Sequence, residues 1–375
     1  MVDKGGQGGV LFTELKFGRC TLPNRIVMSP MTRSRADENF APPAMAVTYY
    51  TQRASAGLII AESTTPSPSG HCYVHQPGIY TKTQIDAWRK VTDSVHKAGG
   101  RIFLQLNHGG RAGHPLNQPT GGEIIGPSPI AMNGTRYTDQ LGEAPPPTPR
   151  AMKLDDIKQV VADFGKAASN AVDAGFDGIE LHCSTGYLME QFLNPSSNHR
   201  TDAYGGSIQN RARFVVELLM SVSDSIGPDR VGIRVSPYSF LNDLVGEYPG
   251  MEDTYRHLVA EMNRIGVLYQ HLKDVSALGG AVFKKPLRDE MRHLFKGITL
   301  QNGDFDKERA AATLAAKEGD AIVFGRPFIG NPDLVARLAN DWPIVIHNEA
   351  TVYTPGPKGY IDYPTYNPAQ ERVGA

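Results

Sequence analysis

The sequence predicts an α/β protein of the (β/α)₈ TIM-barrel class, and two observations carry this prediction. First, eight short apolar segments alternate with longer amphipathic segments, and no region contains strands alone. Second, no GxGxxG turn follows the first apolar segment, which runs instead into Pro30-Met31-Thr32-Arg33. An open doubly wound sheet is the alternative for this alternation, but it would need that turn.

The eight apolar segments are expected to form the barrel strands. They are Ile26–Ser29, Gly57–Glu62, Arg101–Leu106, Gly178–His182, Val231–Ser236, Val267–Leu272, Gly297–Leu300 and Asp320–Phe324. Each segment is short and precedes an amphipathic stretch, which is the order that a parallel barrel requires.

The amphipathic stretches are expected to form the outer helices. They span roughly residues 45–55, 83–98, 153–174, 207–226, 252–264, 286–295, 306–318 and 331–340. Three of them carry start signals, namely Thr83 followed by Asp86, Asp306, and the pair Asn331-Pro332.

Two segments lie outside this repeat. Residues 11–22 are expected to form a hairpin that caps the bottom of the barrel, and residues 107–152 form a long insertion after the third strand. An insertion of this length is typical of a functional lid. We expect one domain over residues 1–375, with residues 1–10 and 367–375 as flexible tails.

Composition narrows the class of protein. The 375 residues carry 38 Lys and Arg against 39 Asp and Glu, and this balance gives no electrostatic footprint for nucleic acid or an anionic membrane. No apolar run is long enough to span a bilayer, and the N-terminus lacks a secretory segment. Three sparse cysteines argue against a disulfide scaffold or a zinc site, so we expect a cytoplasmic enzyme.

In such a barrel the active site lies at the C-terminal ends of the strands. Only Glu62 offers a carboxylate there, which disfavours a glycosidase with paired carboxylates. His108 and His182 are expected to have no acidic companions at the strand ends, which disfavours a metal-dependent hydrolase. No lysine is expected at the end of the sixth strand, which disfavours a Schiff-base aldolase.

Neutral hydrogen-bonding residues dominate the strand ends instead. They are Thr32, Gln105, His182, Thr185 and Tyr187, a set that suits a polar planar ligand. Gly303 and Gly325-Arg326 follow the last two strands, where many barrels hold a phosphate. A polar planar group with one phosphate describes flavin mononucleotide (FMN). A barrel hydrolase or lyase without flavin is the alternative.

A series of motifs extends over about residues 11–366. They are Asn24–Arg33, Gln105–Arg111, Gly178–His182, Gly186–Leu188, Gln191–Leu193, Arg200–Ser207, Asn210-Arg211, Arg234–Pro237, Phe324–Arg326, Asn331–Leu334 and Gly359–Pro364. In these motifs the chain resembles the Old Yellow Enzyme family of FMN-dependent ene reductases. Their order and spacing together make the resemblance strong.

The resemblance implies a role for each candidate residue. The residues implied to line the isoalloxazine and ribityl groups are Pro30, Thr32, Ser63, Gln105 and Arg234, and those implied to hold the phosphate are Gly303, Gly325 and Arg326. His182 and Thr185 would bind the activating oxygen of the substrate, and Tyr187 would be the proton donor. Tyr73, Tyr353 and Asn107 would shape the substrate side, and no metal is implied.

The family's chemistry implies two half-reactions. A nicotinamide, NADPH in preference to NADH, would reduce tightly but non-covalently bound FMN. An α,β-unsaturated carbonyl or nitro compound would then accept hydride at its β-carbon and a proton from Tyr187. The expected partners are therefore small molecules only, and the chain is expected to be a monomer or a homodimer.

Thr185 departs from the family pattern, which has His or Asn at this position. Its hydroxyl is a shorter donor, so a degenerate member that binds FMN but turns over substrates weakly is the alternative function. Arg33 and Arg35 are interpreted as structural or solvated, and Tyr49 and Tyr50 as core residues.

Overall fold

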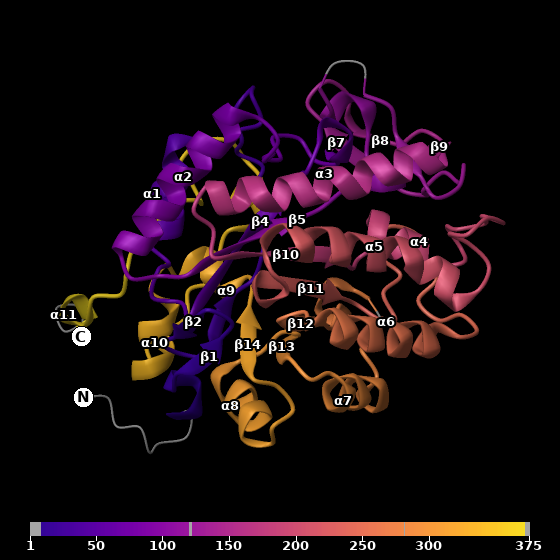
Figure 1. Cartoon of the computed structure of the whole chain (residues 1–375). Coiled ribbons are helices and arrows are strands. Elements are labelled where there is room, and N and C mark those ends of the chain that lie inside the picture. Colours follow the sequence, from indigo (N-terminus) through magenta and orange to yellow (C-terminus); the bar gives the residue numbers. More distant parts are fainter. Residues whose placement is uncertain (1–8, 120–121, 281, 372–375) are drawn as a thin grey trace.

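The computed structural model describes residues 9–119, 122–280 and 282–371 and shows a closed parallel barrel surrounded by helices (Figure 1). The barrel strands are β3 (Ile26–Met28), β4 (Leu58–Thr64), β5 (Ile102–Leu106), β10 (Gly178–Cys183), β11 (Val231–Val235), β12 (Tyr269–Lys273), β13 (Ile298–Asn302) and β14 (Ala321–Phe324). All eight predicted strands are confirmed. Because β14 pairs with β3, the sheet has no open edge, which excludes the doubly wound alternative.

Helices cover the outside of the barrel. They are α1 (Ala44–Thr51), α2 (Lys82–Lys97), α3 (Leu154–Asp173), α4 (Leu188–Leu193), α5 (Ile208–Ile226), α6 (Met251–Ile265), α7 (Lys285–Leu294), α8 (Lys307–Ala315), α9 (Pro327–Gly330), α10 (Leu334–Asn340) and α11 (Pro368–Glu371). The helices α3, α5, α6 and α7 follow one another around one side (Figure 1). Their apolar faces and the outward faces of the strands form one large core.

Of the three predicted helix-start signals, one is confirmed and two are wrong. Asp306 caps α8 by accepting the N–H of Arg309 at 2.7 Å, as predicted. The cap of α2 is Thr81 rather than Thr83, because Thr81 and Gln84 form the capping box. Asn331-Pro332 starts no helix, because the Asn331 side chain instead pairs with the backbone of Val345 at 2.9 Å.

The bottom of the barrel is closed by the predicted hairpin. Strands β1 (Leu15–Phe17) and β2 (Cys20–Leu22) pair antiparallel. Phe17 packs against Phe103 and Tyr269 inside the barrel, with ring centroids 5.6 and 5.4 Å away. This aromatic plug fills the lower barrel, so any ligand must enter at the opposite end.

The insertion after β5 carries small elements of its own. Strands β7 (Arg136–Thr138) and β8 (Gly142–Ala144) form a hairpin, and β6 (Ile125–Gly126) pairs with β9 (Arg150–Ala151). In the view of Figure 1, β7, β8 and β9 are drawn above α3. The Arg111 guanidinium donates to the Asp243 carbonyl at 2.5 Å and so ties the insertion to the loop after β11.

The expected tails are structured where the structure describes them. Gly9 and Val10 belong to a 3₁₀ helix, η1 (Gly9–Phe12), that packs against α8, and residues 368–371 form α11. Residues 1–8 and 372–375 lie outside the described residues.

Candidate active site

A cavity of about 390 Å³ opens at the C-terminal ends of the barrel strands, where the sequence places the site. This volume lies in the range of small-molecule sites. Ten predicted residues line it: Pro30, Thr32, Tyr73, His182, Thr185, Tyr187, Arg234, Gly325, Arg326 and Tyr353.

Four predicted residues lie beside the cavity rather than on its wall. Ser63 Oγ accepts hydrogen bonds from Asn107 Nδ2 at 3.1 Å and from Gln76 Nε2 at 2.8 Å, so Ser63 and Asn107 contact each other. Gly303 lies between two lining residues, and a Cβ there would lie 2.9 Å from that of Asp274. That close approach explains the glycine by packing.

The fourth residue, Gln105, belongs to a polar group inside the barrel, which we call the inner layer (Gln105, Glu180, Tyr269 and His271). Glu180 Oε1 accepts from Gln105 Nε2 at 2.8 Å, while its Oε2 accepts from His271 Nδ1 at 2.8 Å and the Tyr269 hydroxyl at 3.1 Å. His271 and the nearby charge of Arg234 lower the pKa of Glu180 despite its burial, and burial lowers the pKa of His271. The layer is therefore a carboxylate held by neutral donors.

The mouth layer consists of His182, Arg234 and Lys273. His182 and Lys273 lie two residues beyond Glu180 and His271 on β10 and β12, and Arg234 lies on β11 between these strands. Arg234 is 8% exposed and Lys273 is 9% exposed, and both line the cavity. Within the described residues neither cation has a hydrogen-bond or ion-pair partner, and the Arg234 Nε is fully buried and unpaired. Two buried cations without protein partners indicate an anionic or strongly polar ligand.

The expectation that no lysine lies at the end of the sixth strand is wrong, because Lys273 lies there. β12 is the sixth barrel strand and ends at Lys273. The apolar pattern stops at Leu272, but the ladder continues because Lys273 still pairs with Asn302 of β13. Burial is the main cause that lowers the pKa of Lys273 to about 7, followed by the charge of Arg234.

His182 and Thr185 lie together at the cavity, as predicted. Burial first, then the charge of Arg234, keeps the pKa of His182 well below its usual value, so its imidazole is neutral. Ser184 Oγ lies 3.2 Å from His182 Nδ1, and in the tautomer in which Ser184 donates this hydrogen bond the other ring nitrogen carries a proton for a ligand. A neutral donor suits a carbonyl or nitro oxygen.

The loop that carries Thr185 is held in an unusual conformation. Thr185 has φ of +54°, a left-handed value that is strained for a β-branched residue. Its N–H donates to Ser236 Oγ at 2.9 Å, and its carbonyl accepts from Asn242 Nδ2 at 2.7 Å. The next N–H, of Gly186, donates to the buried Glu190 carboxyl at 2.7 Å. These bonds fix the loop from behind.

Tyr187 begins α4 and faces the cavity beside Tyr73. Their hydroxyls contact each other, and the Arg136 guanidinium of β7 lies 5.7 Å from the Tyr73 ring. Burial raises the pKa of Tyr187 well above its usual value, while the charge of Arg136 acts in the opposite direction. Tyr187 is therefore protonated at neutral pH, as a proton donor must be.

Sequence reasoning missed the residues that support this site. Arg136 on β7 and Asn242 in the loop after β11 lie far apart in the chain, and no local pattern predicts their contact. Lys273 is missed because the apolar pattern predicts that the sixth strand ends at Leu272, one residue too early. Glu190 did leave a signal, because an acid three residues after the helix cap at Tyr187 is typical of a capping pattern.

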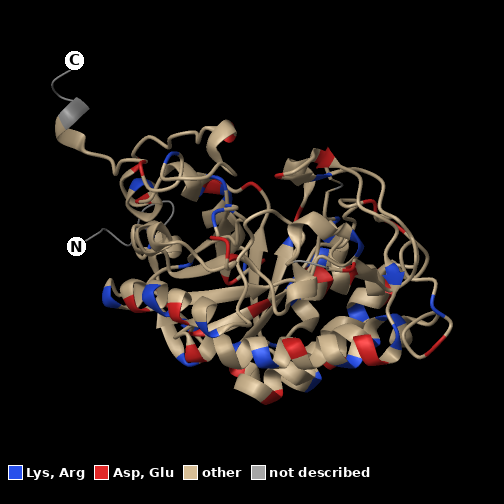
Figure 2. Ribbon diagram, turned by 90° about the horizontal axis from the view of Figure 1, so that it is seen from above, with Lys and Arg blue, Asp and Glu red and all other residues tan. Residues whose placement is uncertain are grey.

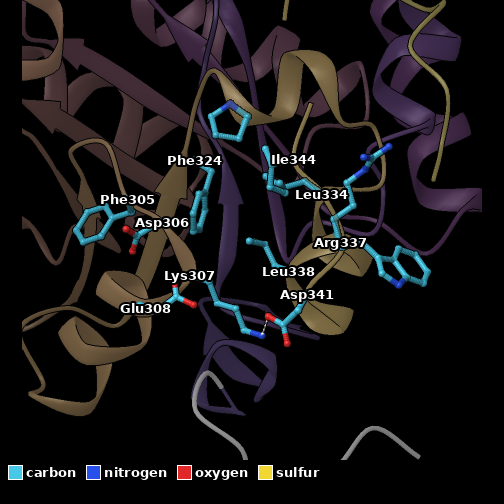
Figure 3. Close-up of a pocket in the computed structure, with 12 residues that line it drawn as sticks. Phe305, Asp306, Lys307, Glu308, Phe324, Leu334, Arg337, Leu338, Asp341 and Ile344 are labelled. Carbon is cyan, nitrogen blue, oxygen red and sulfur yellow. Dashed lines mark hydrogen bonds and ion pairs between the residues drawn. The ribbon is translucent and has the colours of Figure 1, made fainter. Parts of the chain in front are cut away.

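A second cavity, of about 400 Å³, lies beside the first and shares Phe305, Phe324 and Pro327 with it (Figure 3). Its two cations are already paired, with Lys307 Nζ 2.5 Å from Asp341 Oδ1 and Arg337 Nε 2.7 Å from Asp333 Oδ1. The unpaired cations of the mouth layer therefore favour the first cavity as the active site.

Outside the two cavities, the described charged residues mix both signs on the outer helices and form no single-sign cluster in Figure 2. No cluster of three His, Cys, Asp or Glu side chains in the described ranges is placed to hold a metal ion. In the same part of the chain, no helix is long and apolar enough to cross a membrane.

A closed barrel whose mouth combines two unpaired cations, a neutral histidine and two tyrosines fits a flavin-dependent oxidoreductase. A profile of the NADH:flavin oxidoreductase / NADH oxidase family matches residues 10–344. The chain is 40% identical over 362 residues to a probable flavin mononucleotide-dependent alkene reductase of Leishmania infantum, covering 95% of this chain and 97% of the relative.

The solved structures agree with this class. Morphinone reductase superposes with a TM-score of 0.92 at 41% identity, over 97% of this chain and 98% of that one. An Old Yellow Enzyme homologue from Zymomonas mobilis has a TM-score of 0.91 at 38% identity, over 95% of this chain and 99% of that one. The chain belongs to the NADH:flavin oxidoreductase / NADH oxidase family and, within it, to the Old Yellow Enzymes, which confirms the resemblance.

Arg33 and Arg35 bond backbone carbonyls, and Tyr49 and Tyr50 are buried, as interpreted.

Proposed function

We propose that this protein reduces the activated C=C bond of α,β-unsaturated carbonyl or nitro compounds with NADPH as the preferred reductant. One observation carries the proposal: His182, Thr185 and Tyr187 line the same cavity as the unpaired Arg234. Donors for the activating oxygen and a protonated tyrosine therefore lie beside a site for the cofactor.

The residues of the cavity fit FMN. The buried Arg234 Nε has no protein partner, and this donor suits the polar edge of a flavin ring. Pro30, Thr32 and Arg234, which line the cavity, would hold the ring and ribityl chain, and Ser63 and Gln105 would support them from beside the cavity. Gly303, Gly325 and Arg326 would hold the phosphate. When bound, FMN supplies the hydride that reaches the β-carbon of the substrate.

The protein's own groups would polarise and protonate the substrate. His182 and Thr185 would donate hydrogen bonds to the activating oxygen and stabilise the negative charge that develops there. The Tyr187 hydroxyl would give its proton to the α-carbon, and the Tyr73 hydroxyl beside it can donate to the oxygen left behind. Tyr353, which is largely exposed, would border the cavity on the substrate side.

A nicotinamide partner is supported by one neighbour. Morphinone reductase has been solved in complex with tetrahydroNAD, and that chain superposes with a TM-score of 0.90. Preference for NADPH over NADH stays a prediction, to be tested by the rate of flavin bleaching with each reductant.

The test uses purified protein under anaerobic conditions. We expect a yellow protein whose flavin absorbance is bleached by NADPH and restored by 2-cyclohexenone. A colourless protein that takes up no FMN would exclude the proposal. The short hydroxyl of Thr185, in place of His or Asn, favours a second candidate, a protein that binds FMN but turns over enones weakly. In that case NADPH would bleach the flavin and the enone would restore it only slowly.

A further inference from the structure

We infer that the Lys273 ammonium is a third cation of the cofactor site and binds the phosphate of FMN between Arg234 and Arg326. The inference rests on the FMN of the proposed function and adds a residue that neither the motifs nor the resemblance indicated.

The order of the barrel strands places Lys273 between the two arginines. β12 lies between β11, which carries Arg234, and β13, whose end leads to Asp304; Arg326 follows β14, the next strand. Lys273, Arg234 and Arg326 all line the cavity. The glycines expected at the phosphate follow β13 and β14, so Lys273 lies on the strand next to them.

Lys273 has no anionic partner among the described residues, although two carboxylates lie near it. Asp274 Oδ1 accepts the Ser276 N–H at 2.8 Å, and Asp304 Oδ1 pairs with Arg326 Nη2 at 3.2 Å. Other lysines, such as Lys284 with Glu247 at 2.7 Å, pair directly with a carboxylate. An ammonium that is 9% exposed and unpaired is costly to keep unless a ligand compensates it.

The charges that face Lys273 determine how readily its side chain keeps a proton. Arg234 on β11 and Arg326 after β14 oppose its charge, and Asp274 and Asp304 favour it. His271, two residues earlier on the same strand, is the other titratable neighbour, and its lowered pKa leaves it neutral. Burial and Arg234 lower the pKa of Lys273 to about 7, so an incoming phosphate would restore the proton. FMN binding above pH 7 should therefore take up a proton.

The test compares two flavins and four proteins. Apoprotein is titrated with FMN and with riboflavin, which lacks the phosphate, by flavin fluorescence. For Lys273→Met we expect FMN affinity to fall roughly 10- to 100-fold while riboflavin affinity changes less than about twofold. Lys296→Met, an exposed lysine before β13 at the other end of the barrel, is the control and should match the wild type.

The pH dependence supplies a second readout. The FMN phosphate stays dianionic above about pH 6, so a change between about pH 7 and 9 reports on the protein. Wild-type affinity for FMN should fall over this range, with proton uptake measured by calorimetry in buffers of different ionisation enthalpy. Lys273→Met should show no uptake, and Lys273→Arg should keep tight binding without the pH dependence.

Two outcomes would overturn the inference. One is wild-type FMN affinity in Lys273→Met, and the other is an equal loss for FMN and riboflavin, which would assign Lys273 to the flavin ring. A wild type that binds FMN but reduces no enone would instead contradict the proposed function. The FMN and riboflavin titrations would still test the role of Lys273 in that case.

Discussion

The inner layer and the mouth layer differ sharply although they share strands. Glu180 and His182 lie two residues apart on β10, and so do His271 and Lys273 on β12. In the inner layer both Glu180 oxygens accept hydrogen bonds from protein groups. In the mouth layer Arg234 and Lys273 have no such partners in the described chain. Hydrogen-bond pairing within the protein therefore distinguishes residues that stabilise the barrel from residues that are available to bind a ligand.

The largest effect is expected at the mouth. Tyr187→Phe should slow alkene reduction about 10²- to 10⁴-fold, because the α-carbon loses its general acid. Reduction of the flavin by NADPH should stay nearly unchanged, since that step takes no proton from Tyr187. Stopped-flow measurement of the two half-reactions checks this, with Tyr137→Phe, whose side chain on β7 is exposed, as control. Equal slowing of both half-reactions would contradict the role.

The inner layer should respond in stability instead. Glu180→Ala leaves His271, Tyr269 and Gln105 without their shared acceptor, so we expect the free energy of unfolding to fall by about 3–5 kcal/mol. Denaturant titration measures it. Glu38→Ala, at an exposed position, should change the same quantity by less than about 0.5 kcal/mol. A loss as small as the control's would mean that the inner layer does not stabilise the barrel.

Sequence patterns predict the two layers unequally. The strands follow from apolar runs, and the motifs around His182 and Tyr187 lead to residues that do meet in one cavity. Lys273 is not predicted, because its strand ends on a charged residue that faces the cavity, and a search for apolar runs does not include such a residue. Asn242 and Arg136 escaped because their contact depends on how two loops fold over the barrel. Gln105 matches a motif, yet its amide bonds Glu180, a partner that only the register of β5 and β10 reveals.

Glu190 behind the Thr185 loop should make stability depend on pH. Burial raises its pKa from 4.5 to about 8, so between these values the folded chain holds a proton that the unfolded chain has lost. Stability therefore falls as pH rises from about 5 to 8, by at most about 1.4 kcal/mol per pH unit from this group.

Glu190→Gln removes this proton exchange and should flatten the decline. The free energy of unfolding is measured across this pH range for Glu190→Gln, the wild type and Glu308→Gln, whose carboxyl is exposed. A slope that stays as steep as in the wild type would place the pH dependence elsewhere.

The smallest effect is expected at Thr185, where strain and function meet. Asn tolerates the left-handed conformation better than a β-branched residue, so Thr185→Asn should raise the free energy of unfolding by about 0.5–1 kcal/mol. Its longer amide should also bind phenolic ligands more tightly, as read from their charge-transfer bands with the flavin. Thr185→Gly separates the two effects, because it relieves the strain but provides no donor. If Thr185→Asn changes neither quantity, the backbone at this position is not strained and its side chain does not reach the ligand.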